Sequence, residues 1–199
     1  MKKSFYRLTL DIAGFIIRID SEIDFNRFKD LDKLAGFVSE ENKHFDCCLT
    51  LKSCRPPLPS KKKYHFNPAD NWKIFKTNNG FLVEVGVPDK LGEINEVIEF
   101  NADYTRGTVY RKKIFELSRY FLDQFIIINL LSRHQGFILH ACGLVWNGKG
   151  LVFCGRSGAG KSTLLKLFSS EVSSEALLND DRIAVREYGR QWKIFGTPW

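Results

Sequence analysis

Gly155-Arg156-Ser157-Gly158-Ala159-Gly160-Lys161-Ser162-Thr163 is the stretch of this sequence that decides the fold. It fits the P-loop pattern G-x-x-x-x-G-K-S/T at every fixed position. The apolar run at residues 150–154 predicts a buried strand before the loop, and the pattern of residues 161–168 predicts a helix after it. Strand, glycine-rich loop and helix in this order indicate a phosphate-binding loop.

The motif acts mostly through its backbone. The N–H groups at a helix N-terminus have no partner within the helix and attract anions. Glycines let the backbone approach a phosphate because they carry no Cβ. We expect the whole loop, residues 155–163, to bind a nucleotide, with Lys161 reaching the β and γ phosphates and the Ser162 hydroxyl facing Mg²⁺. The alternative is a glycine-rich turn that binds nothing, and the matching strand and helix argue against it.

The composition is that of an ordinary globular protein. Of 199 residues, 44% are apolar and 27% are charged, enough for one substantial domain or a small domain with part of a larger one. The net charge of +7 suits a partner that carries phosphate or acidic groups. The Lys and Arg residues are scattered, however, so we expect no nucleic-acid partner. The one tight cluster, Lys61-Lys62-Lys63, is interpreted as a solvated loop.

The five cysteines indicate neither a disulfide framework nor a zinc site. His44, Cys47, Cys48 and Cys54 lack the second Cys/His pair that zinc spacing requires. The first residues lack the apolar block of a signal peptide, and the apolar stretch at residues 121–131 is too short and too polar to span a bilayer. We therefore expect a reduced, cytoplasmic protein without a membrane partner.

Residues 1–110 are expected to form a strand-rich N-terminal region without assigned chemistry. Extended runs alternate there with turn signals, and only residues 31–38 show a short helical pattern. The predicted strands are residues 5–11, 14–19, 45–51, 72–76, 81–87 and 96–101. Residues 111–134 carry apolar side chains on more than one face. This pattern predicts a packing helix within a linking segment, residues 111–135, before a core at residues 136–199.

The core is expected to contain a mixed sheet. Residues 137–146 are predicted to form a strand and residues 147–150 a hairpin turn, so the strand entering the P-loop has an antiparallel neighbour. Residues 182–186 and 191–195 predict a further hairpin. Most P-loop proteins use a doubly wound parallel sheet instead. The expected fold class is therefore α/β of the mixed α+β kind.

Two adjacent aspartates and a histidine are the other candidate site residues. Asp180-Asp181 follows Lys161 by about twenty residues, where one carboxylate can hold Mg²⁺ while the other accepts a proton from an attacking hydroxyl. The alternative is a polar turn, because Asn-Asp-Asp is good turn material. His140 lies on the strand before the P-loop strand, so its ring could approach the phosphates. A lone histidine in an apolar strand is, however, more often a core residue.

Three further stretches accompany the P-loop in a fixed order along the chain: Leu139-His140-Ala141-Cys142-Gly143-Leu144-Val145, Gly148-Lys149-Gly150-Leu151-Val152-Phe153 and Leu178-Asn179-Asp180-Asp181-Arg182-Ile183. With the P-loop, these stretches resemble the HPr kinase/phosphorylase family, bacterial serine kinases that share a P-loop fold with ATP-dependent phosphoenolpyruvate carboxykinase. The resemblance covers residues 137–185 and is closest to HPr-kinase-like proteins found beside peptide-modification genes.

The resemblance implies an ATP-dependent kinase that phosphorylates a serine or similar hydroxyl of a peptide or small protein. It implies that His140 lies at the active site and that Lys161 and Ser162 bind nucleotide and metal. Asp180 and Asp181 would divide the base and metal roles, with Mg²⁺ assigned to Ser162 and Asp181. Family members often form oligomers, which implies a homo-oligomer by analogy.

The sequence also departs from the family. Thr163 stands where the regulatory enzymes usually carry an acidic residue, and residues 4–110 match no motif of their N-terminal domain, so HPr is not the expected acceptor. The family continues past the position of Trp199, which predicts a C-terminally truncated core. The alternative function is an ATP-binding module without transfer activity, acting as a sensor or assembly partner. A decarboxylating carboxykinase is not expected, because the chain is far too short.

Overall fold

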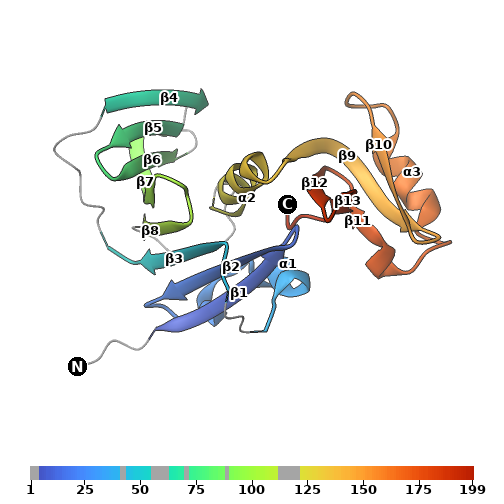
Figure 1. Cartoon of the computed structure of the whole chain (residues 1–199), viewed down its shortest axis with the longest axis horizontal. Coiled ribbons are helices and arrows are strands. Elements are labelled where there is room, and N and C mark those ends of the chain that lie inside the picture. Colours follow the sequence, from blue (N-terminus) through green and yellow to red (C-terminus); the bar gives the residue numbers. More distant parts are fainter. Residues whose placement is uncertain (1–4, 41–43, 55–62, 70–71, 88–89, 112–121) are drawn as a thin grey trace. The chain divides into compact units, whose positions relative to one another are not determined.

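The computed structural model describes residues 5–40, 44–54, 63–69, 72–87, 90–111 and 122–199 (Figure 1). Contacts divide the chain into two compact units: unit 1 is Met1–Leu10 with Ile16–Arg119, and unit 2 is Asp11–Phe15 with Tyr120–Trp199. The class is α+β, strand-rich, with two sheets and few helices. The structure thereby confirms the expected mixed α+β class.

Unit 1 is built on an eight-stranded sheet with the order β1-β2-β3-β8-β7-β6-β5-β4. Its strands are β1 (Tyr6–Ile12), β2 (Phe15–Ser21), β3 (Cys47–Lys52), β4 (Lys63–Ala69), β5 (Trp72–Thr77), β6 (Gly80–Val87), β7 (Lys90–Asn101) and β8 (Arg106–Arg111). The short helices η1 (Phe25–Arg27), α1 (Leu31–Leu34) and η2 (Ala35–Phe37) lie between β2 and β3 in the sequence. Strands β2, β3 and β8 run parallel, and the pairs from β8 to β4 are antiparallel.

The alternation of side chains places one face of the parallel strands in the core. Ile17, Leu49 and Val109 are at most 2% exposed, while the residues directly before and after each of them in the sequence are half-buried. Successive side chains of a strand point to opposite faces, so this period of two separates an apolar face from a polar one. The polar face of β2, β3 and β8 is therefore set by the sequence itself.

Two expectations for this unit need correction. Arg111 is the last residue of β8 and pairs with Glu96 of β7, so it does not begin a helix. The helix that follows is α2 (Leu122–Arg133), and residues 112–121 of the predicted helix lie outside the described residues. The prediction of a loop is wrong for Lys63, which begins the edge strand β4. Lys61 and Lys62 lie outside the described residues. β4 contains Pro68, which an edge strand tolerates because one side of its backbone has no neighbour.

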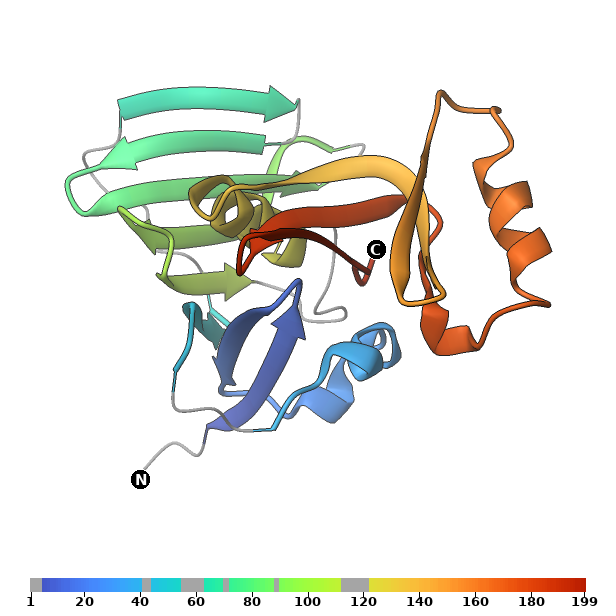
Figure 2. The ribbon, with the colours of Figure 1, turned by 45° about the vertical axis from the view of Figure 1, so that its right-hand side comes forward.

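Unit 2 is organised around the long strand β9 (Gly136–Trp146) (Figure 2). Its other elements are α2, β10 (Lys149–Cys154), α3 (Lys161–Phe168), η3 (Ser174–Ala176), β11 (Leu177–Asn179), β12 (Arg182–Tyr188) and β13 (Gln191–Phe195). The sheet order is β10-β9-β12-β13, with β11 also paired to β9, and all its pairs are antiparallel. β10 occupies one edge of β9, and β11 and β12 follow each other along the opposite edge.

The two predicted hairpins of this unit are confirmed. Asn147 and Gly148, with φ of 49° and 73°, form the turn between β9 and β10, and Gly189 and Arg190, with φ of 61° and 69°, form the turn between β12 and β13. Two consecutive positive φ angles suit the right-handed twist of a hairpin, which is why Asn-Gly is a strong signal.

Helix α3 covers one face of the β9–β10 hairpin. Leu165 packs on the buried side chains of Cys142 and Leu144. This packing fixes the start of α3 close to the end of β10. Among the described residues, no helix is both long and apolar enough to cross a bilayer.

Candidate nucleotide-binding site

The loop between β10 and α3 has the backbone of an open phosphate cradle. Gly158 and Gly160 have φ of 79° and 84°, values that favour glycine because L side chains are strained there. No atom lies within 4 Å of where a Cβ would stand at either position. Gly160 is the N-cap of α3, and as a glycine it has no side chain that could accept a hydrogen bond from the first N–H groups of the helix. The first N–H groups of α3 therefore lack an intrahelical partner and are available to an anion.

Lys161 places its ammonium at the base of the loop. Its Nζ donates to the carbonyl oxygen of Gly155 at 2.8 Å and to that of Arg156 at 3.3 Å. The loop is also closed by the backbone N–H of Ala159, which donates to Arg156 at 3.1 Å. The Lys161 ammonium thus contacts the backbone of the loop in which it is expected to bind phosphate. The other side chains of the predicted loop are exposed, namely those of Arg156, Ser157, Ala159, Ser162 and Thr163.

Cys142 ties this loop to the central strand. Its Sγ donates to the carbonyl oxygen of Lys161 at 3.2 Å. Burial raises the pKa of the Cys142 thiol, which keeps the sulfur protonated and able to donate. The start of α3 is therefore attached to β9 both by apolar packing and by this hydrogen bond.

β9 also connects the loop to the paired aspartates. Cys154, the last residue of β10, pairs with Ala141 on one side of β9. On the other side, the N–H of Ala141 donates to the carbonyl oxygen of Asp181 at 3.0 Å. Neighbouring strands are about 4.8 Å apart, so the entry to the loop and Asp181 lie roughly 10 Å from each other across β9. Cys154 and Asp181, which are 27 positions apart in the sequence, thus lie on opposite sides of Ala141.

The two aspartates lie at the break between β11 and β12 and have different surroundings. Asp181 Oδ1 lies 3.0 Å from Nδ1 of His140, and Asp181 Oδ2 lies 3.4 Å from Nε of Arg182. The carboxylate of Asp180 is exposed and makes no hydrogen bond or ion pair with any residue that the structure describes. One carboxylate is therefore held in place, and its neighbour is free to contact a ligand.

Asn179 builds the turn that presents these carboxylates. Its Oδ1 accepts from the backbone N–H groups of Asp181 at 2.7 Å and Arg182 at 3.0 Å. Its Nδ2 donates to the carbonyl oxygens of Thr197 and Trp199, both at 2.9 Å. Sequence reasoning gave Asn179 no role beyond turn composition, and nothing in the sequence singles out Thr197 or Trp199 as its partners.

The predicted metal ligands fit a metal only together with a bound phosphate. Within the described part of the chain, no three His, Cys, Asp or Glu residues form a group that could hold an ion. Mg²⁺ is commonly held by one or two carboxylates with waters and substrate phosphates, not by an all-protein cage. A hydroxyl at Ser162 and a carboxylate at Asp181 match that ligand set in chemistry.

No family model matches this chain, and neither the curated proteins nor the solved structures contain a significant match to it. What the site does must therefore follow from its own geometry and chemistry.

Proposed function

We propose that the protein is an ATP-dependent kinase of the HPr-kinase-like kind, which transfers a γ-phosphoryl group to a serine or similar hydroxyl of a peptide or small protein. The observation that carries the proposal is the loop at residues 155–163, with two left-handed glycines and the Lys161 ammonium at its base. The aspartate pair lies across one strand from this loop. Phosphoryl transfer recurrently uses a phosphate cradle, a metal ion and a residue that positions or deprotonates the nucleophile, and this loop and aspartate pair could supply the protein groups for all three.

The residues would divide the work as follows. The backbone N–H groups of Gly158 and of residues 160–163 and the Lys161 ammonium would bind the phosphates, with Lys161 exchanging loop carbonyls for phosphate oxygens. Ser162 and Asp181 would hold Mg²⁺, which supplies positive charge to neutralise the phosphate oxygens when bound. His140 would orient Asp181, as ligating carboxylates are usually hydrogen-bonded in turn.

Asp180 would act as the general base. Its free carboxylate would accept the proton of the acceptor hydroxyl while the acceptor oxygen forms a bond to the γ-phosphorus. The bond between that phosphorus and the bridging oxygen breaks, and ADP leaves with the electron pair. Transfer of this kind depends on positioning and charge stabilisation, and two aspartates with different surroundings would supply one group for each task.

A second candidate is an ATP-binding module without transfer activity. The observation that favours it is the exposure of the pair beside the loop, because the side chains of His140 and Asp181 are 59% and 47% exposed. Enzymes that transfer phosphoryl groups exclude water from the reacting centre. The same loop would then bind ATP without presenting it to an acceptor.

Calorimetry with ATP and magnesium tests the feature that both candidates share. We expect binding by the unmodified protein and none by Lys161→Ala, whereas Lys166→Ala, on the exposed side of the same helix, binds normally. Circular dichroism of each variant shows that it is folded. An absence of heat with a folded unmodified protein overturns both candidates.

Incubation with γ-labelled ATP and candidate peptides, followed by mass spectrometry, separates the two candidates. Label on a peptide hydroxyl supports the kinase. Nucleotide binding without transfer to any candidate peptide supports the module.

A further inference from the structure

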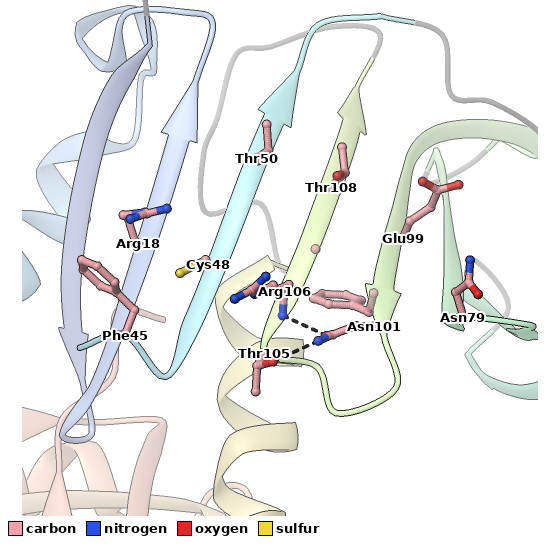
Figure 3. Close-up of a pocket in the computed structure, with 12 residues that line it drawn as sticks. Arg18, Phe45, Cys48, Thr50, Asn79, Glu99, Asn101, Thr105, Arg106 and Thr108 are labelled. Carbon is pink, nitrogen blue, oxygen red and sulfur yellow. Dashed lines mark hydrogen bonds between the residues drawn. The ribbon is translucent and has the colours of Figure 1, made fainter. Parts of the chain in front are cut away.

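The polar face of the parallel strands in unit 1 carries a broad hollow of about 940 Å³ that the proposed function does not use (Figure 3). It is shallow, open to solvent, and lies over β2, β3, β8 and β7. Its lining is mostly polar and includes Arg18, Cys48, Thr50, Arg106 and Thr108. Sites for small molecules are usually enclosed and mainly apolar, so this surface is of a different kind.

Strand register places these side chains in two rows. Arg18 pairs with Cys48, and Cys48 pairs with Arg106, so the two arginines flank one thiol on the same face. With strands about 4.8 Å apart, the Cα atoms of Arg18 and Arg106 are roughly 10 Å from each other. Two residues further along, Thr50 pairs with Thr108. A row of two cations therefore lies beside a row of hydroxyl groups.

The cations of the hollow have capacity for a ligand. The guanidinium of Arg106 makes no hydrogen bond or ion pair with any described residue and is exposed. Arg18 Nε is buried and lies 3.2 Å from Asp20 Oδ2, so only the terminal nitrogens of this guanidinium are left for a ligand in the hollow. Asp20 is shared with Arg7, whose Nε donates to it at 2.9 Å. Glu99, the one acidic residue in the lining, already accepts a hydrogen bond from the Tyr110 hydroxyl at 3.1 Å.

The parallel arrangement of these strands suggests that the hollow is covered by a bound partner. Parallel strands are normally covered on both faces, whereas an antiparallel sheet commonly leaves one face in water. Here β2, β3 and β8 are parallel, yet the described residues leave a hollow over their polar face.

We propose that this hollow binds an acidic peptide segment, with its carboxylates on Arg18 and Arg106 and its polar groups on Thr50 and Thr108. Charge complementarity selects the acidic partner. The aromatic rings of the lining argue against single-stranded nucleic acid, which needs open ring faces for its bases. The Phe45 ring is covered by the Arg18 guanidinium, 4.8 Å from its centroid, and Phe100 is only 4% exposed. The proposal does not depend on nucleotide binding.

Fluorescence anisotropy tests this with a labelled Glu-Ser repeat peptide and matched Lys-Ser and Gln-Ser peptides. We expect the Glu-Ser peptide to bind best and to lose affinity with added salt. Arg106→Gln should weaken it about tenfold, as expected for the loss of one charge-assisted pair. Arg27→Gln, an exposed arginine of the same unit outside the hollow, serves as the matched control.

Cys48 provides a second readout at the centre of the hollow. In a Cys54→Ser, Cys154→Ser variant, which removes the two exposed thiols, the half-buried Cys48 is the most accessible remaining cysteine. Saturating Glu-Ser peptide should slow the alkylation of Cys48 severalfold.

Two variants separate this proposal from the proposed function. Lys161→Ala should bind the peptide normally, and Arg106→Gln should bind ATP as the unmodified protein does, so each proposal can fail without the other. Equal affinity for the acidic and basic peptides, an unaltered affinity in Arg106→Gln, or displacement of the peptide by a single-stranded oligonucleotide overturns this proposal.

Discussion

Nδ1 of His140 lies 3.0 Å from Oδ1 of Asp181. This contact joins a side chain of the central strand β9 to one of the two adjacent aspartates. The backbone pairing that creates this contact places His140 opposite Arg182 across β9 and β12. Asp180, one residue earlier, has no such partner among the described residues. Two neighbouring carboxylates thereby acquire different environments, and their replacement should have separable effects.

Asp180→Asn and Asp181→Asn should each lower the rate of phosphoryl transfer about a hundredfold or more, while ATP affinity changes only a few fold. The loss expected is that of the proposed general base or of the proposed metal ligand. His140→Ala should lower the rate about tenfold, because its proposed role is to orient Asp181. Single-turnover transfer and calorimetry measure the two quantities, with Glu175→Gln as an exposed control in the nearby η3. Near-normal transfer in both aspartate variants would remove their proposed roles.

Gly160→Ala should abolish ATP binding, whereas Gly148→Ala should leave it intact. Both positions have left-handed φ, 84° and 73°, so both substitutions strain the backbone by about 1–2 kcal/mol. Only Gly160 lies in the proposed phosphate-binding loop; Gly148 lies in the β9–β10 turn. Equal losses of binding in the two variants would show that strain, not the cradle, is responsible. Thermal melting of each variant checks that the strain is matched.

Asn179→Ala should destabilise unit 2 by about 2–4 kcal/mol, because it removes hydrogen bonds worth about 1 kcal/mol each and leaves buried groups unpaired. Asn179→Asp keeps the acceptor that holds the N–H groups of Asp181 and Arg182, but it loses the donation to Thr197 and Trp199. We therefore expect the Asp variant to retain more transfer activity than the Ala variant. Denaturant titration with near-ultraviolet circular dichroism measures the stability, and identical activities would contradict a positioning role.

Tyr110 should ionise at a higher pH than an ordinary tyrosine. Burial and the neighbouring carboxylate of Glu99 raise the pKa of Tyr110 from 10.0 to about 12. Because the folded pKa lies above the unfolded one, this residue's contribution to stability is complete below about pH 10 and is lost as the pH rises toward 12. The difference in absorbance at 295 nm between the unmodified protein and Tyr110→Phe should titrate near 12 when folded and near 10 in denaturant. A folded titration near 10 would contradict the prediction.

Arg186 should hold the β1–β2 turn against β12. It is buried, its Nη1 donates to the carbonyl oxygen of Ala13 at 3.0 Å, and its guanidinium lies 3.9 Å from the centroid of the Phe15 ring. A desolvated cation–π contact with a buried hydrogen bond is worth about 2–3 kcal/mol. Arg186→Ala should speed hydrogen exchange at residues 11–15. Lys193→Ala should not, because among the described residues the Lys193 Nζ contacts only the exposed ring of Tyr188, 4.6 Å from its centroid.

How far the sequence could predict the structure depended on how local each signal was. The helix at residues 161–168, the turn at residues 147–150 and the hairpin of residues 182–186 and 191–195 were predicted because propensity, glycine placement and period agree within a few residues. Arg111 was assigned to a helix because its neighbours are helical in pattern. Its pairing with Glu96 places it in a strand, and no local signal reports that partner.

The sequence by itself determined the P-loop pattern and the alternation that makes one face of β2, β3 and β8 polar, because both are properties of adjacent residues. Only the tertiary structure decided that His140 reaches Asp181, that Asn179 holds residues 197 and 199, and that Arg18 and Arg106 flank Cys48. Those relationships arise from strand register, which brings together residues far apart in the chain. Register depends on the packing of whole strands, so no short segment encodes it alone.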